Sequence, residues 1–158
     1  MKDVRIIKAT QSHVDGLRGR LRRSDCGEVL AATGLAPDAG LERSFSMSCM
    51  AWAVVEKAEV IAMFGVGASS LSGTGSPWLL GTDALVRQVR GFIQHSREYI
   101  DLMRQRFPNL VNWVDARNAA SVRWLGWCGF TVEEPVPFGP FGLPFHKFHM
   151  GGGHVYRN

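Results

Sequence analysis

The sequence predicts an α/β domain built on a mixed sheet with helices on both faces. Strand-like and helix-like segments alternate only in the second half of the chain, which is typical of crossover connections. In the first half, two apolar runs over residues 50–56 and 60–66 are separated by a short charged turn, which is typical of an antiparallel pair. The two patterns together favour a mixed sheet over a purely parallel one.

Length and composition fit one globular domain. The chain has 158 residues, of which 46% are hydrophobic and 20% charged, so it can bury a sizeable core. We assign residues 1–150 to the domain and residues 151–158 to a flexible tail. No apolar run approaches the ~20 residues of a membrane span, and charges interrupt the N-terminal segment. Neither a membrane span nor a signal peptide is expected, and a cytoplasmic setting follows by default.

Charge, cysteine and histidine content argue against nucleic-acid and metal binding. The chain has 18 Lys and Arg against 14 Asp and Glu, a net charge of +4, which is too small to indicate a nucleic-acid partner. Its three cysteines are widely spaced without a CxxC pair, which argues against a disulfide framework or a zinc site. His146 and His149 lie three apart on an expected strand and so point to opposite faces, and with His154 they are not expected to hold a metal ion.

The first half of the chain predicts a strand followed by three helices. In order, these are a strand over 4–8, an amphipathic helix through Val14, Leu17 and Leu21, a helix that ends at Gly34 and a helix over 41–48. Ser12 and Asp15 resemble a capping box for the first of these helices. Its outer face is expected to be basic, with Arg18, Arg20, Arg22 and Arg23.

The second half predicts a strand, a long helix and then short alternating elements. A strand over 78–81 precedes a helix whose apolar face carries Val86, Val89, Ile93, Ile100, Met103 and Phe107, and Pro108 ends that helix. Its other face is basic, with Arg87, Arg90, Arg97 and Arg104. There follow a strand over 110–114, a helix over 118–128, a strand start at 130–132, a rigid irregular loop over 135–144 and a last strand over 145–150.

Residues 111–130 resemble the fifth strand, fourth helix and sixth strand of the GNAT acyltransferases. Asn118 begins the helix, Ser121 is the small residue three positions on, and Gly129-Phe130 marks the turn into the next strand. Each position has a physical reason, since Asn caps a helix, Gly takes the left-handed C-cap and Phe enters the core. The resemblance implies a GNAT-like fold.

Short motifs along nearly the whole chain are similar to a phage-encoded GNAT-like family that includes the internal virion protein A of podoviruses. They are Ala9-Thr10 with His13-Val14, the segment 78–83, Asn112-Trp113-Val114 leading to Asn118, and Phe145-His146-x-Phe148. This resemblance implies a virion-associated protein of phage or prophage, with virion proteins as partners, located in the host cytoplasm or the virion interior.

Two features of active GNAT enzymes have no clear counterpart. Their pyrophosphate loop has the form Gln/Arg-x-x-Gly-x-Gly/Ala, and the nearest match, residues 88–93, has Ile93 at the second small position and falls inside the predicted long helix. A helix beginning near Asp83 would instead present a carboxylate to the phosphates. The resemblance also implies a proton-donating Tyr seven residues after Asn118, where this chain has Leu125. These differences predict a degenerate site that binds acetyl-CoA weakly or not at all.

The alternative function is an acetyl-CoA-dependent N-acetyltransferase with a divergent pyrophosphate loop. The resemblance implies that the strands over 78–81 and 110–114 run parallel and splay apart. The cofactor pocket is then expected near Leu80, Asp115, Asn118 and Ser121, with Arg87 and Arg90 as substitute phosphate ligands.

No catalytic residue stands out. The candidates are Cys128, which reads more readily as a core thiol than as an acid, and Glu133, which reads more readily as a solvated strand end than as a base. The aromatic cluster between Phe138 and Phe148 either closes the open end of the sheet or forms a homo-oligomer interface, and both alternatives stay open.

Overall fold

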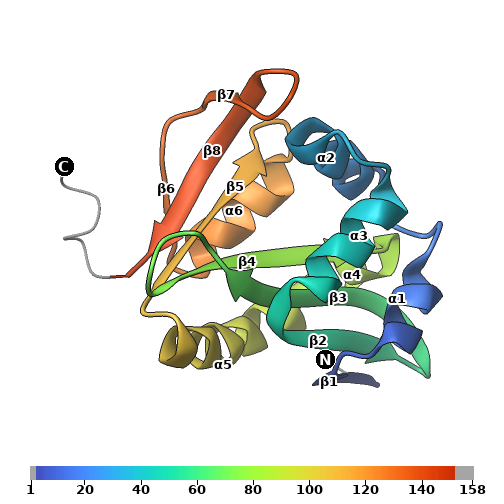
Figure 1. Ribbon diagram of the computed structural model, residues 1–158. Helices are drawn as coiled ribbons and strands as arrows, with labels where there is room; N and C mark the ends of the chain where they lie inside the picture. The colour runs from blue at the N-terminus through green and yellow to red at the C-terminus, as the bar shows by residue number, and fades with distance from the viewer. Residues whose placement is uncertain (1–2, 152–158) are drawn as a thin grey trace.

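The computed structural model describes residues 3–151, so the predicted tail lies outside it apart from Gly151. The strands are β1 (Val4–Lys8), β2 (Ser48–Glu56), β3 (Glu59–Ala68), β4 (Thr74–Gly81), β5 (Asn109–Asp115), β6 (Thr131–Val132), β7 (Val136–Phe138) and β8 (Leu143–Met150). The helices are α1 (Gln11–Leu17), α2 (Arg23–Thr33), α3 (Pro37–Ser46), α4 (Asp83–Arg87), α5 (Val89–Arg106) and α6 (Ala119–Trp127). All strands form one sheet in the order β1-β2-β3-β4-β5-β8-β6, and β7 pairs with β8 (Figure 1).

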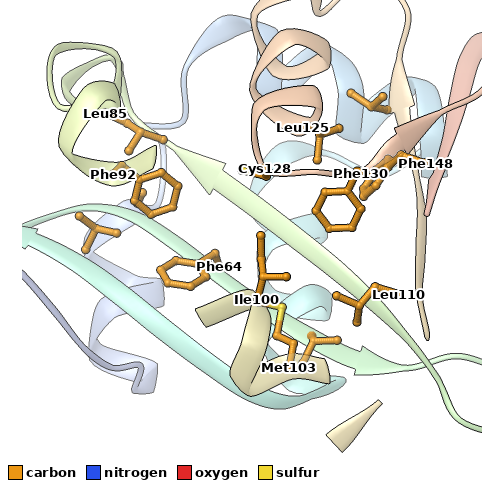
Figure 2. Packing of buried hydrophobic residues seen from close by; sticks show 14 of the residues in the cluster. Phe64, Leu85, Phe92, Ile100, Met103, Leu110, Leu125, Cys128, Phe130 and Phe148 are labelled. Atoms are coloured by element: carbon orange, nitrogen blue, oxygen red, sulfur yellow. The ribbon is translucent and has the colours of Figure 1, made fainter. Parts of the chain in front are cut away.

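The sheet is mixed and has a hydrophobic core on each face, as predicted. Side chains alternate along β2, where Val54 packs in one core while Ala53 and Val55 pack in the other. The first core contains side chains of α5 and α6, and Figure 2 shows Ile100 and Met103 of α5 between Phe64 and the residues of β5 and α6. The second core contains side chains of α1, α2 and α3.

Strands β4 and β5 are parallel and separate almost at once. Their backbones pair only at Thr74 with Asn109 and at Gly75 with Leu110. Beyond this point they leave their common starting corner in different directions, and α2 lies beside the far end of β5 (Figure 1). This confirms the predicted splay, and it opens a gap in the middle of the sheet.

The predicted caps of α2 and α6 are confirmed. Gly34 ends α2 in the left-handed conformation with φ of 76°, and Gly129 follows α6 with φ of 98°. The Asn118 side chain accepts a hydrogen bond from the N–H of Ser121 and so caps α6. These residues place α6 directly after the diverging end of β5.

The first helix is shorter than predicted. It ends at Leu17 instead of reaching Leu21, because the chain turns through Gly19 with φ of 71°. Thr10, not Ser12, is its N-cap residue. The prediction that Arg22 lies on an outer basic face is wrong, since its side chain is only 12% exposed and pairs with a buried carboxylate.

The predicted long helix is broken in two. α4 covers Asp83–Arg87, Gln88 is not helical, and α5 starts anew at Val89. Val86 is 56% exposed and so does not belong to the apolar face, whereas the Val89 side chain is outside the described part of the molecule. The break moves residues 88–93 from the predicted helix interior to the first turn of α5.

The segment 135–144 is not wholly irregular. Val136, Pro137 and Phe138 form the edge strand β7, which pairs with Phe145, Pro144 and Leu143 of β8. Proline fits there because an edge strand leaves half of its N–H groups without a neighbour.

Candidate functional site

A cavity of about 220 Å³ lies where β4 and β5 separate. Residues from both helix layers line it: Phe92, Ser96, Tyr99, Ile100, Met103, Ser121, Trp124 and Leu125 from α5 and α6, and Glu28, Val29, Ala32, Thr33 and Ser44 from α2 and α3. The cavity therefore extends through the sheet, from one helix layer to the other. A ligand bound on the α5 and α6 side can meet a second molecule that enters from the α2 and α3 side.

An asparagine side chain sets the narrow end of the gap. Asn112 on β5 donates from Nδ2 to the Pro77 carbonyl on β4 at 2.7 Å, and its Oδ1 accepts the N–H of Trp113 at 2.9 Å. The amide thus takes the place of a strand-to-strand hydrogen bond just after the backbones have parted. It fixes the point at which the gap becomes wide enough for a ligand.

The backbone of Leu79 faces this gap. Along a strand, the backbone N–H and C=O groups of consecutive residues point to opposite sides. The N–H of Thr82 bonds Ile61 of β3, whereas the N–H of Gly81 bonds Asp25 on the opposite side. The backbone groups of the odd-numbered residues of β4 therefore point away from β3. The Pro77 carbonyl, which bonds Asn112, obeys the same alternation. Leu79 therefore presents its N–H and C=O to the cavity, between two positions whose outward groups are already bonded.

Two carboxylates one helical turn apart on α2 occupy the far ends of the diverging strands. Asp25 accepts the Gly81 N–H at 2.9 Å and pairs with Arg22 at 2.8 Å, and it is 1% exposed. Glu28 accepts the Asp115 N–H of β5 through Oε1 at 2.9 Å. Since their spacing puts both side chains on one face of the helix, α2 spans the open end of the gap.

Glu28 is the carboxylate that lines this cavity. Its side chain is partly buried at the cavity wall, and desolvation raises the pKa of Glu28 to about 7. The Asp115 N–H and the Asn118 amide act to lower this pKa, whereas the charges of Asp25 and Asp115 act to raise it. Glu28 is therefore divided between its neutral and ionised forms near neutral pH.

Asp115 itself is held in the ionised form. Burial acts to raise its pKa, but hydrogen bonds from the side chain and N–H of Arg117 outweigh burial and lower the pKa of Asp115. The guanidinium contacts both carboxylate oxygens, at 2.6 Å to Oδ2 and 3.0 Å to Oδ1. Asp115 therefore stays ionised and does not serve as a proton acceptor.

The structure brings only some of the expected cofactor residues to the cavity. Leu80 and Ser121 line it. Asp115 has given its N–H to Glu28, and Asn118 is the buried N-cap of α6. Arg87 and Arg90 (the latter in the first turn of α5) are exposed and do not line the cavity.

Neither expected catalytic candidate lines the cavity. Cys128 is 5% exposed in the core next to α5, and desolvation raises the pKa of its thiol to about 11. Glu133 is exposed at the end of β6, where its carboxylate lies 3.4 Å from Nε2 of His149 and its carbonyl contacts His146. Within residues 3–151, no three His, Cys, Asp or Glu side chains gather closely enough to hold a metal ion.

The side of the cavity formed by α5 and α6 is mainly apolar around Leu125. Leu125 and Trp124 project from α6, and the Trp124 ring stacks on Phe92 at 5.7 Å between centroids. The indole Nε1 of Trp124 is buried without a hydrogen-bond partner. The Leu125 side chain has no group that can donate a proton.

Comparison with solved structures identifies the fold as that of the GNAT acetyltransferases. The chain is similar to yncA from Salmonella typhimurium, solved with its cofactor acetyl-CoA, at 19% identity and a TM-score of 0.64 over 99% of both chains. It is similar to the ribosomal-protein-S18-alanine N-acetyltransferase from Escherichia coli at 13% identity and a TM-score of 0.62, over 97% of this chain and 99% of that one. A GNAT-family acetyltransferase from Bacillus anthracis matches at 9% identity and a TM-score of 0.66, over 94% and 95%.

No protein-family model and no curated protein matches the chain. The structural likeness therefore establishes the architecture, and the chemistry has to be argued from the residues of the cavity. Among the described residues, no helix is long and apolar enough to cross a membrane.

Sequence reasoning missed Asp25, Glu28 and Asn112. The first two are acidic residues three apart in a helix of low amphipathicity, a pattern that usually marks a solvated face. Nothing local in the sequence shows that this helix crosses the open end of a sheet. Asn112 is a polar residue between apolar neighbours on a strand, and a polar side chain within a central strand usually needs a hydrogen-bond partner. That pattern was the one signal by which the sequence could have indicated its role.

Proposed function

We propose that this chain is an acetyl-CoA-dependent N-acetyltransferase. The observation that carries the proposal is the cavity that passes through the sheet beside the unpaired edge of β4, with the backbone of Leu79 directed into it. The fold that this chain shares with acetyltransferases supports the choice of cofactor. Acetyl-CoA supplies the thioester, and the residues of the cavity bind and orient it.

Leu79 is the group that we expect to act on the thioester. Its N–H is fixed by β4 and can donate to the carbonyl oxygen, which gains negative charge as an amine attacks the carbonyl carbon. Phe92, Trp124 and Leu125 exclude water from this place and so strengthen that hydrogen bond. The pantetheine arm can pair with the remaining open edge of the gap.

The pyrophosphate is expected at the start of α5. Because the helix begins at Val89, its first-turn N–H groups have no acceptor within the helix, and Gly91 allows close approach. Arg87 and Arg90 are exposed cations next to this turn, and Asp83 in the first turn of α4 opposes them. The divergent loop therefore weakens phosphate binding without removing its main donors.

Leu125 predicts a slow chemical step. Without a donor at that position the sulfur departs as a thiolate and takes its proton afterwards from solvent, so the general-acid contribution of roughly 10²–10⁴ in rate is absent. The phage setting and virion partners implied by the sequence motifs concern where such an enzyme works. They stay predictions beside the proposed chemistry.

A proline substitution tests the role of Leu79. Leu79→Pro removes the N–H that faces the cavity. β4 already contains a proline, Pro77, two positions earlier, where the backbone groups point to the same side. We expect release of free CoA from acetyl-CoA and an amine to fall by roughly 10²–10³-fold in kcat/KM. The control is Leu79→Ala, which keeps the N–H and trims the side chain, and which should retain most of the activity. Equal losses in both variants would contradict the proposal.

A further inference from the structure

The cavity carries a single ionisable carboxylate and no cation. Among the described residues that line it there is no Lys, Arg or His, and Glu28 is the only Asp or Glu. A bound molecule with its own negative charge would find no partner there, whereas a cation would find Glu28. The charge pattern therefore selects for an amine and against a carboxylate near the reacting centre.

The wall on the Glu28 side is aromatic. Trp78 packs with the core of α1, α2 and α3, and Trp113 faces the same side because its neighbour Val114 belongs to the opposite core. The Trp113 ring is held by stacking on Phe138 at 4.3 Å, and the indole Nε1 of Trp78 donates to Ser48. Val29 and Ala32 complete an apolar surface next to the carboxylate.

The geometry of Glu28 suits proton transfer. Its carboxylate is oriented by the 2.9 Å hydrogen bond from the Asp115 N–H, which also fixes it to the strand that forms one side of the gap. Leu79, on the other strand, also lines the cavity. A substrate between the two strands can contact both groups.

We propose that Glu28 is the catalytic base, and that the acceptor is a primary amine on an apolar, aromatic-sized carrier without a carboxylate. This inference rests on the proposed acetyltransferase function and adds the proton acceptor and the substrate class. The amine enters as a cation, and one N–H bond breaks as its proton passes to the Glu28 carboxylate. The neutral nitrogen then forms the bond to the carbonyl carbon, the carbon–sulfur bond breaks, and the second proton of the nitrogen ends on the thiolate by way of solvent.

Two carboxylates, each paired with an arginine, lie around Glu28. Asp25 on α2 and Asp115 on β5 face it with negative charge, and Arg22 and Arg117 are each bound to one of those carboxylates. Desolvation, with smaller contributions from the charges of Asp25 and Asp115, outweighs the hydrogen bonds to the Glu28 carboxylate and raises the pKa of Glu28 to about 7. The carboxylate can therefore both take a proton and return it to water.

The test is the Glu28→Gln variant, which can still accept the Asp115 N–H but cannot take a proton. The assay follows CoA release with 2-phenylethylamine, and phenylalanine serves as the same skeleton with a carboxylate. We expect wild-type kcat/KM to rise with pH through an apparent pKa near 7, and the variant to lose roughly 10²–10⁴-fold together with this rise. Glu59→Gln, at an exposed pair with Arg20, is the matched control and should behave as wild type.

Acetyl-CoA binding by calorimetry, measured on the same two proteins, separates the two proposals. Unchanged acetyl-CoA affinity with lost turnover of 2-phenylethylamine supports the inference. Three results would overturn the inference and leave the acetyltransferase proposal standing, provided that the wild type binds acetyl-CoA. The wild type acetylates phenylalanine and 2-phenylethylamine equally well, it acetylates neither amine, or the Glu28→Gln variant stays active. If the wild type does not bind acetyl-CoA, both are overturned.

Discussion

Asn112 on β5 donates a 2.7 Å hydrogen bond to the carbonyl of Pro77 on β4, and this side chain is the link that continues the sheet after the two backbones separate. The same amide accepts the N–H of Trp113. A single residue therefore satisfies one backbone group on each side of the gap.

Replacing Asn112 by Ala should destabilise the fold. The change leaves the Pro77 carbonyl and the Trp113 N–H without their partner, and we expect a loss of about 1–3 kcal/mol in the free energy of unfolding. Chemical denaturation monitored by circular dichroism measures it. Gln105→Ala, at an exposed position of α5, is the control with little expected effect. A variant as stable as the wild type would show that the bridge does not hold the strands.

The buried pair of Asp25 and Arg22 should matter far more than the exposed pair of Arg20 and Glu59. Asp25→Ala removes the carboxylate that pairs with Arg22 and accepts the Gly81 N–H in a buried place, and we expect a loss of about 3–5 kcal/mol. Glu59→Ala breaks a solvent-exposed pair and should cost about 0–1 kcal/mol. Urea unfolding of the two variants compares them directly, and similar losses would argue against α2 as the element that closes the gap.

The Glu28→Gln variant should be more stable than the wild type at high pH. The pKa of Glu28 is about 7 in the folded protein and 4.5 as its ordinary value, so the folded state binds the proton more tightly. The contribution of this proton to the stability of the folded wild type is complete below pH 4.5 and is lost as the pH rises through 7. Since Glu28 is partly buried and one pKa unit corresponds to about 1.4 kcal/mol, we expect the variant to gain about 1–3 kcal/mol at pH 8.

At pH 5 the gain should largely vanish, because folded wild-type Glu28 is then neutral. Thermal unfolding at both pH values provides the measurement. A variant that is less stable than the wild type at pH 8 would contradict the raised pKa, and it would also remove one support for Glu28 as a base.

The aromatic cluster between Phe138 and Phe148 divides into two parts. Phe145 and Phe148 are buried and Phe138 stacks on Trp113, so these rings close the domain, whereas Phe141 is 60% exposed. We expect Phe145→Ala to cost about 3–5 kcal/mol and Phe141→Ser to leave the stability of the monomer unchanged within about 0.5 kcal/mol. Association through this region would appear as a later elution of Phe141→Ser in size-exclusion chromatography. An unchanged elution volume would contradict a homo-oligomer formed through Phe141.

Much of the fold could be predicted from local sequence signals. The cap residues Gly34, Asn118 and Gly129 and the hairpin between β2 and β3 depend on neighbours in the chain, so they are visible in the sequence. The break of the long helix at Gln88 was not visible, because the apolar spacing continues across it while the local backbone changes to φ of −105° and ψ of 7°.

The site was predicted only in part, because local sequence signals do not show contacts between residues that are far apart in the chain. Leu80 and Ser121 belong to elements that the GNAT resemblance covers, and they line the cavity. Glu28 acts across 87 positions of sequence on the N–H of Asp115, and a contact of that range depends on how α2 is placed over the sheet. Cys128 is a core thiol, which is the interpretation that the sequence favoured.

The most direct test of the acetyltransferase account is titration calorimetry of the purified protein with acetyl-CoA. The account predicts saturable binding of one molecule per chain with a dissociation constant below ~100 μM, which corresponds to about −5.5 kcal/mol or better. Arg87→Ala combined with Arg90→Ala should weaken this binding and reduce its dependence on salt, since both cations lie next to the expected phosphate site. An absence of saturable heat up to ~1 mM acetyl-CoA would contradict the account and favour a fold kept without its cofactor.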